Sequence, residues 1–277
     1  AQRDFYGNNE TVFLFLWISA DMPGNSDEQH NSSTLRAIAV LEAIAAADGP
    51  IGLVELIDAT GLPKPTVHRI VGLLLDAGLL LREAEGKRYA PGPRLASLGL
   101  AALTHVAWRA PRHAILKSLV AEIGETCNLT LLDGTEVVYL DRVEAAWPLR
   151  LHFQTGSRVP AHCSASGKLL LALLPSRERK RILEALPFSY HTDHTITRRR
   201  DLEAALKRIR SERLSTDDEE YLDGTVCVAV PVESDKRRVP AALAVHAPTS
   251  RMTLKQALQC VPALRRAAAR LAESFPD

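Results

Sequence analysis

Residues 61–76 read GLPKPTVHRIVGLLLD, a stretch with the pattern of a two-faced helix. At 3.6 residues per turn, Val67, Ile70 and Leu74 fall on one apolar face. The opposite face carries Pro65, Arg69, Gly72 and Asp76, with Thr66 and Leu73 on one flank and His68 on the other. Proline is tolerated in the first turn of a helix, where the N–H groups have no intrahelical partner. The stretch therefore predicts a helix that begins after Pro63 and buries only one side.

The segments around this helix predict a compact winged helix-turn-helix. Apolar residues recur at helical spacing from Leu35 to Ile44 and again from Leu53 to Ile57, and Gly61 ends the second of these helices. After the quoted stretch, two short strands at 79–82 and 87–89 are expected to form a hairpin. The order helix, helix, tight turn, helix, hairpin is typical of a winged helix-turn-helix.

The polar face of the quoted helix predicts DNA binding. A recognition helix buries one stripe and offers polar side chains near its N-terminus to the base edges of double-stranded DNA. The hairpin adds cations where a wing meets the phosphate backbone. The candidate DNA-binding residues are Lys64, Pro65, Thr66, His68, Arg69, Arg82, Lys87 and Arg88. An amphipathic helix in a helical bundle would show the same two faces, and the basic hairpin that follows favours DNA.

The rest of the chain predicts a second domain of mixed structure. A helical pattern runs from Pro93 to about Glu125, with a break expected at Pro111. Asp133-Gly134 supplies a hairpin turn between two of the strands that follow. Strands are expected at 129–132, 137–140, 149–153, 226–232 and 241–246, and helices at 166–174, 177–186, 201–213 and 254–274. Together these patterns predict an α+β domain around an antiparallel sheet.

Four parts of the chain follow from these patterns. Residues 1–32 are expected to be a disordered arm or an upstream extension, because a polar run follows Met22, which we expect to be the natural start. Residues 33–92 form the winged helix-turn-helix, residues 93–110 a linker helix, and residues 111–277 the second domain.

Composition limits the classes of function. Of 277 residues, 46% are hydrophobic and 24% charged, which is enough apolar mass for real cores. The net charge of +1 does not decide on DNA, because a basic face can be balanced by an acidic remainder. The four cysteines include no CxxC pair, which argues against a zinc ribbon and fits a reduced, cytoplasmic protein. The apolar run at 12–18 is too short to span a membrane, so no membrane partner is expected.

Two further segments carry a specific pattern of spacing and residue type. They are GSRVPAHCSASGK at 156–168 and STDDEEYLDGTVCVAVPV at 215–232. With GLPKPTVHR at 61–69, they make the sequence from about Ser33 onward resemble the IclR family of bacterial transcriptional regulators. The resemblance implies a winged helix-turn-helix, a linker helix and a GAF-like α/β effector domain, assembled as a homodimer or a dimer of dimers.

The same resemblance implies a pocket for a small organic effector, a carboxylate or aromatic acid. Carried onto this chain, the pocket residues are Leu151, Ala165, Ser166, Asp217, Cys227, Ala244 and His246. Amide groups at a helix N-terminus suit an anion, because unpaired N–H groups and the helix dipole both favour negative charge there. The chain departs from relatives that carry small hydroxyl residues on the last strand, since it has Ala244 and His246, and a histidine could pair with an anionic ligand. It also has Arg213 where relatives often have glycine.

Rival functions remain open from the sequence. A metal or nucleophile cluster could be formed by His162, Cys163, Asp217, Cys227 and His246. However, no zinc-like spacing is present, and buried cysteines usually behave as small hydrophobic residues. The acidic run 217–220 is most simply a solvated turn or helix cap. We therefore expect a ligand-responsive regulator, either a repressor or an activator, with no enzymatic activity, no cofactor and no metal. The alternatives are a small-molecule enzyme with an accessory winged-helix interaction domain, and a winged helix that binds protein.

Overall fold

The computed structural model describes residues 32–47, 49–83, 86–104, 106–146, 153–233 and 241–274. Most of the expected N-terminal arm, and Leu151 with most of the strand expected at 149–153, lie outside the described residues. The chain divides into two compact units, residues 1–98 and residues 99–277. Each unit has its own hydrophobic core and is described by itself.

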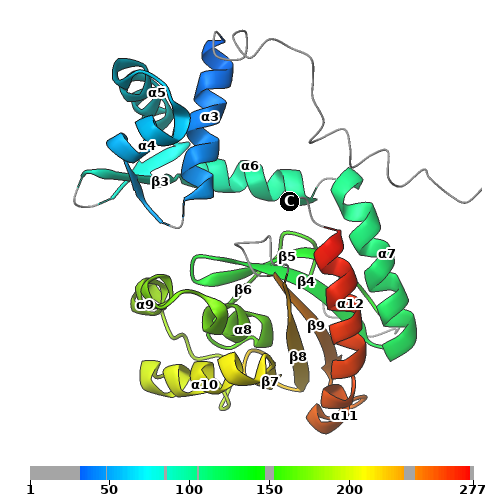
Figure 1. Cartoon of the computed structure of the whole chain (residues 1–277). Coiled ribbons are helices and arrows are strands. Elements are labelled where there is room, and N and C mark those ends of the chain that lie inside the picture. The colour runs from blue at the N-terminus through cyan, green and yellow to red at the C-terminus, as the bar shows by residue number, and fades with distance from the viewer. Residues whose placement is uncertain are drawn as a thin grey trace, which may run out of the picture. The chain divides into compact units, whose positions relative to one another are not determined.

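The first unit is a winged helix-turn-helix (Figure 1). Its elements are α3 (Ser33–Ala46), β1 (Ile51–Gly52), α4 (Leu53–Thr60), α5 (Lys64–Asp76), β2 (Leu80–Arg82) and β3 (Arg88–Pro91). Apolar side chains from every helix and from the hairpin meet in one core that includes Val40, Leu56, Val67 and Tyr89. The predicted helices and hairpin are confirmed. Strand β1, which pairs antiparallel with β3, was not predicted because two residues are too few to show a period.

The turn between α4 and α5 depends on one glycine. Gly61 ends α4 with a φ of 66°, in the left-handed region, and its N–H donates to the carbonyl of Ile57. Glycine reaches this conformation without the steric cost that a Cβ would add. Pro63 then precedes α5, and Pro65 lies in its first turn as predicted. This local chemistry fixes where the quoted helix begins.

The break predicted at Pro111 is wrong. Helix α6 spans Pro93–Thr104, and α7 runs from Val106 to Ile123 with Pro111 inside it. A proline inside a helix removes one backbone hydrogen bond, and burial of the same helix compensates for this loss: Leu116 and Leu119 are buried in the core of the second unit. Tertiary packing thus overrides the local preference.

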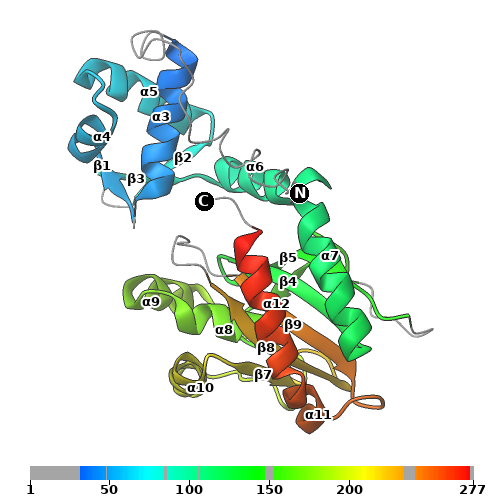
Figure 2. The ribbon, with the colours of Figure 1, turned by 45° about the vertical axis from the view of Figure 1, so that its right-hand side comes forward.

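The second unit is built on a six-stranded antiparallel sheet in the order β6-β5-β4-β9-β8-β7. The strands are β4 (Thr126–Asp133), β5 (Glu136–Val143), β6 (Arg158–Pro160), β7 (Ser215–Asp218), β8 (Thr225–Val232) and β9 (Ala241–Pro248). One face is covered by α7, α11 (Leu254–Gln259) and α12 (Val261–Glu273), and the other by α8 (Ala165–Leu173), α9 (Ser176–Ala185) and α10 (Arg199–Glu212) (Figures 1 and 2). The α+β class with an antiparallel sheet is confirmed.

Several local details differ from the sequence expectations. The helix expected at 254–274 is two helices, α11 and α12, which meet at Cys260. Strands β6 and β7 were not predicted, and the acidic run is not a solvated turn, because Asp217 and Glu220 are buried. Arg213 ends α10 with a φ of 54°, which gives the physical reason why glycine suits that position.

Candidate functional site

The outward face of α5 is a surface of exposed polar side chains. Lys64, His68 and Arg69 are exposed and Thr66 is half-buried, while Val67 and three other apolar residues of α5 are buried. Within the part of the chain that the structure describes, these four polar side chains make no hydrogen bond or ion pair. Pro65 is exposed beside them. The side chains are therefore available to an external partner.

Some cationic side chains of the wing make contacts within the first unit, and others are exposed without such contacts. Arg88 donates to the Pro50 carbonyl at 2.8 Å and pairs with Glu55 at 2.9 Å. Glu55 also accepts a hydrogen bond from the N–H of Gly52, so one carboxylate ties the start of α4 to β3. Arg82 lies over the Tyr89 ring at 5.6 Å. Lys87 is exposed with no such contact among the described residues.

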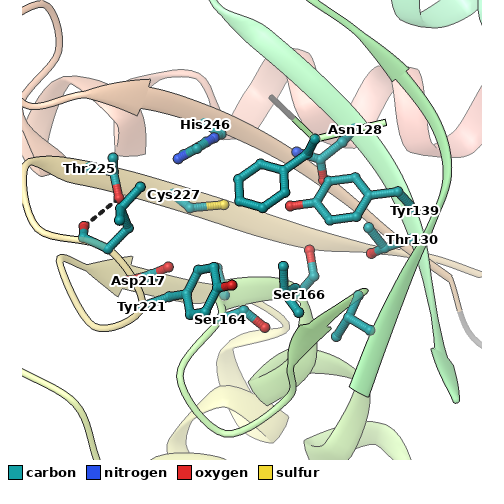
Figure 3. Close-up of a pocket in the computed structure, with 15 residues that line it drawn as sticks. Asn128, Thr130, Tyr139, Ser164, Ser166, Asp217, Tyr221, Thr225, Cys227 and His246 are labelled. Atoms are coloured by element: carbon teal, nitrogen blue, oxygen red, sulfur yellow. Dashed lines mark hydrogen bonds between the residues drawn. The ribbon is translucent and has the colours of Figure 1, made fainter. Parts of the chain in front are cut away.

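The second unit contains a pocket between the sheet and the N-terminus of α8 (Figure 3). Strand register places Asp217 opposite Cys227, and Cys227 opposite His246, so these three residues form one row across β7, β8 and β9. Ser164 and Ser166 lie across the cavity from His246, on the same side as Asp217 (Figure 3). The full lining is Asn128, Thr130, Val137, Tyr139, Phe153, Val159, Ser164, Ala165, Ser166, Asp217, Tyr221, Leu222, Thr225, Cys227 and His246.

The N-terminus of α8 forms the polar floor of this pocket. The Ser164 hydroxyl accepts a hydrogen bond from the N–H of Gly167 at 3.2 Å and donates to the Pro160 carbonyl at 2.9 Å. A Cβ on Gly167 would lie 2.3 Å from the Ala161 carbonyl oxygen, so only glycine allows this approach of helix and loop. The N-terminal amides of the helix remain directed toward the pocket end of α8, where an anion would be favoured.

A buried carboxylate network lies behind the pocket. Lys168 and Glu220 form a buried ion pair, and the N–H of Glu220 donates to Asp217 at 2.8 Å. Burial and the neighbouring Glu220 carboxylate raise the pKa of Asp217 to about 7. Asp217 can therefore change its charge near neutral pH.

His246 and the pocket thiol are uncharged near pH 7. Burial, with the nearby Arg142 and Arg251, lowers the pKa of His246 to about 4. A neutral His246 can form a hydrogen bond with a ligand, so the pairing with an anion expected from the sequence would depend on hydrogen bonding rather than on charge. Burial raises the pKa of Cys227 well above its usual value, whereas reactive cysteines have depressed pKa values.

Aromatic rings close one end of the pocket. Tyr139 and Phe153 stack with ring centroids 5.6 Å apart, and Phe153 lies 6.3 Å from Tyr221. The Arg142 guanidinium lies 5.8 Å from the Tyr139 ring and 5.6 Å from the Phe153 ring. Aromatic rings in the lining offer stacking surfaces to a planar ligand.

The structure brings together five of the seven effector residues named from the sequence. Ala165, Ser166, Asp217, Cys227 and His246 line the pocket. Ala244 does not line it; this residue is fully buried in the core against α8, two positions along β9 from His246. Leu151 lies outside the described residues.

Several lining residues were missed from the sequence. Asn128 and Thr130 are polar residues that alternate with the apolar Cys127, Leu129 and Leu131 in strand β4, a signal that could have been used. Tyr139, Phe153 and Tyr221 come from three distant segments, and no local pattern joins them.

The comparisons with known proteins cover both units. The family described as "Bacterial transcriptional regulator IclR C-terminal" matches residues 100–273, and the one described as "IclR helix-turn-helix domain" matches residues 33–84. Among curated proteins, the "Probable transcriptional regulator SauR" of Cupriavidus necator is 48% identical over 245 residues, covering 88% of this chain and 97% of that protein. In the described residues, no helix has the length and apolarity to cross a membrane.

Two solved structures are similar over most of the chain. The IclR protein of Thermotoga maritima is 27% identical with a TM-score of 0.57, covering 87% of this chain and 97% of that one. An IclR homologue of Microbacterium hydrocarbonoxydans, solved in complex with 4-hydroxybenzoate, is 25% identical with a TM-score of 0.55, covering 88% of this chain and 98% of that one.

Proposed function

The chain belongs to the IclR family of bacterial transcriptional regulators, and from this premise we propose that it is a ligand-responsive regulator without catalytic activity. In this proposal residues 33–92 bind operator DNA and residues 111–277 sense a small organic acid. The regulator works as a homodimer or a dimer of dimers. The observation that carries the proposal is the outward face of α5, where Lys64, His68 and Arg69 are exposed without partners among the described residues.

The proposed DNA contacts divide by chemistry. Thr66, His68 and Arg69 near the start of α5 contact base edges in the major groove, and Lys64 contacts phosphate. In the wing, Lys87 and Arg82 contact the backbone, whereas Arg88 first holds the wing to Glu55. Base contacts select sequence, and phosphate contacts give affinity that falls with salt.

An operator titration tests the DNA proposal. Arg69→Ala combined with Thr66→Ala should weaken binding to a selected duplex by more than tenfold, because one lost bidentate contact costs about 1–3 kcal/mol. Arg181→Ala, an exposed arginine on α9 in the other unit, is the matched control and should bind as the parent does. Unchanged affinity in the double variant, with its fold intact by circular dichroism, would instead support a protein-binding winged helix.

The proposed ligand is a small carboxylate, with an aromatic acid as a well-matched case. Support comes from the N-terminus of α8, from the Arg142 cation beside the aromatic rings, and from the 4-hydroxybenzoate bound by the Microbacterium relative. Asp217 opposes an anion when it is ionised, and its pKa of about 7 makes that opposition depend on pH. A carboxylate ligand should therefore bind more weakly as the pH rises through 7.

A thermal-shift screen of small organic acids tests the pocket, because a ligand that binds only the folded state raises the melting temperature. For any acid that binds, affinity should fall between about pH 6 and 8 in the parent and stay level in Asp217→Asn. The amide analogue of the same acid is the control, since it carries no charge for Asp217 to repel. If no acid binds, or if Asp217→Asn keeps the same pH dependence, the ligand proposal fails while the DNA proposal stands.

Ligand binding can alter DNA affinity only through a difference in affinity between two states of the protein. Operator affinity measured with and without a bound acid supplies the test. If the operator affinity is the same with and without the acid, the acid does not regulate DNA binding.

A further inference from the structure

Three potential metal ligands meet on the loop side of α8, apart from the row of pocket residues on the sheet. His162, Cys163 and His191 each offer one ligand atom, and these atoms lie within 4.8 Å of one another. None of the three lines the pocket. His162 and Cys163 precede the N-cap of α8, and His191 belongs to the segment between α9 and α10.

The hydrogen bonding of His162 leaves one ring nitrogen free to bind a metal. Its Nε2 lies 3.0 Å from the Ser189 carbonyl, and because a carbonyl only accepts, Nε2 must carry the hydrogen. Nδ1 then bears a lone pair, and it is buried with no hydrogen-bond partner among the described residues. A neutral imidazole whose second nitrogen donates to a carbonyl is the form in which histidine binds metals.

The two histidine rings are already close to a shared coordination geometry. Their centroids are 6.0 Å apart, and two imidazoles on one zinc ion, with Zn–N bonds near 2.0–2.1 Å, have centroids roughly 5 Å apart. His191 is exposed, so its side chain can rotate to close the difference. The backbone beneath it is anchored: the hydroxyls of Thr192 and Thr195 donate to the carbonyls of Glu219 and Glu220 at 2.6 and 2.7 Å.

We propose that His162, Cys163 and His191 bind one zinc ion, with a water molecule as the fourth ligand. Two imidazoles and one thiol match the ligands that zinc prefers, and they exclude Mg²⁺ and Ca²⁺, which need oxygen ligands. Zinc binding displaces the thiol proton of Cys163, since a coordinating thiol is deprotonated outright.

Packing alone accounts less well for the same residues. Phe188 lies 5.8 Å from the His162 ring, and Tyr221 meets the His191 ring edge-on at 5.1 Å, so both histidines have aromatic neighbours. Aromatic packing leaves Nδ1 of His162 buried and unsatisfied, however, which is a destabilising state for a polar atom. A metal ion satisfies this atom. Tyr221 also lines the pocket, so the metal would hold His191 against one wall of the ligand site.

Metal titration of the whole chain tests the proposal. The purified protein, with its affinity tag removed, is stripped with a chelator and titrated with zinc chloride by calorimetry. We expect one zinc ion per chain. His191→Ala should weaken zinc affinity at least about tenfold, because it removes a ligand. His194→Ala is the matched control, an exposed histidine three residues along the same segment and outside the cluster, and should bind zinc as the parent does.

Cobalt substitution identifies the sulfur ligand. With cobalt(II), the parent should show a thiolate-to-metal charge-transfer band, which Cys163→Ser should lose and Cys260→Ser should keep. If Cys163→Ser does not fold, His191→Ala decides, because His191 is exposed and its removal leaves the core unchanged. The proposal is overturned by absence of zinc binding, by unchanged affinity in His191→Ala, or by a cobalt complex without a thiolate band.

Discussion

The outward face of α5 and the pocket of the second unit differ in how their functional side chains are supported by the rest of the protein. The side chains of Lys64 and Arg69 project from one continuous helix and make no hydrogen bond or ion pair with the rest of the described chain. Asp217 is buried, comes from a sheet strand, and accepts a hydrogen bond from a residue whose side chain is paired with Lys168. Truncating the polar side chains on the DNA-binding face should therefore alter function without altering stability, whereas changes around the pocket should alter both.

The buried ion pair behind the pocket gives the largest expected effect. Lys168→Met should lower the free energy of unfolding by about 3–5 kcal/mol, because it leaves Glu220 buried without its counter-charge. Arg199→Met is the matched control, since Arg199 pairs with Glu203 on an exposed helix face and should lose less than about 0.5 kcal/mol. Urea denaturation of both variants measures the contrast. Equal losses would mean that burial does not distinguish the two pairs.

The pH dependence of stability should separate Asp217 from the exposed groups. Its folded pKa of about 7 exceeds the unfolded value near 3.9, so the folded state keeps a proton that the unfolded state loses as the pH rises. The contribution of protonated Asp217 to the free energy of unfolding is fully present below about pH 4. It is lost as the pH rises to about 7, and the loss is as much as about 4 kcal/mol. Asp217→Asn should remove this decrease, measured as the difference between the two unfolding curves. If the free energies of unfolding of the parent and of Asp217→Asn change in parallel from pH 4 to 8, burial does not raise the pKa of Asp217.

Two helical glycines provide a third contrast between the regions. Gly167→Ala should cost about 3 kcal/mol, because the new methyl group would meet the Ala161 backbone. Gly72→Ala on α5 should raise the free energy of unfolding by at most about 1 kcal/mol, because a Cβ there meets nothing within 4 Å and alanine favours helix. Thermal unfolding distinguishes them by the sign of the change. A stabilising Gly167→Ala would show that helix and loop can separate.

The same contrast explains what the sequence could predict. The two faces of α5 follow from residues three and four apart, so the buried Val67 and exposed Arg69 were both predicted from a local period. The row of Asp217, Cys227 and His246 depends on the register of three strands. Spacing along the chain does not specify register, and those residues were assigned only through family resemblance.

Two errors have physical causes of the same kind. Pro111 suggested a helix break, but the helix runs through it because its far half is buried in the core. The acidic run near Asp217 suggested solvent, but Lys168 on α8, 52 residues from Glu220 in sequence, compensates a buried carboxylate. His191 was not considered as a metal ligand for the same reason, since only the fold brings it to His162 and Cys163.

The wing supplies the smallest expected effect. Glu55→Ala frees Arg88 and the N–H of Gly52, and because the pair is exposed it should cost less than about 1 kcal/mol of stability. Operator affinity should fall only slightly, since the cation of Arg88 remains. A large loss of stability would mean that this exposed carboxylate is as important as the buried pair.

The most direct test of the account is the salt dependence of operator binding by Lys64→Ala. The logarithm of affinity falls linearly with the logarithm of salt concentration, with a slope set by the number of phosphates neutralised. Fluorescence anisotropy on a duplex selected from a random pool should show a slope smaller by about one in the variant, with the free energy of unfolding unchanged. An identical slope and affinity for the variant and the parent would contradict the assignment of this face to DNA.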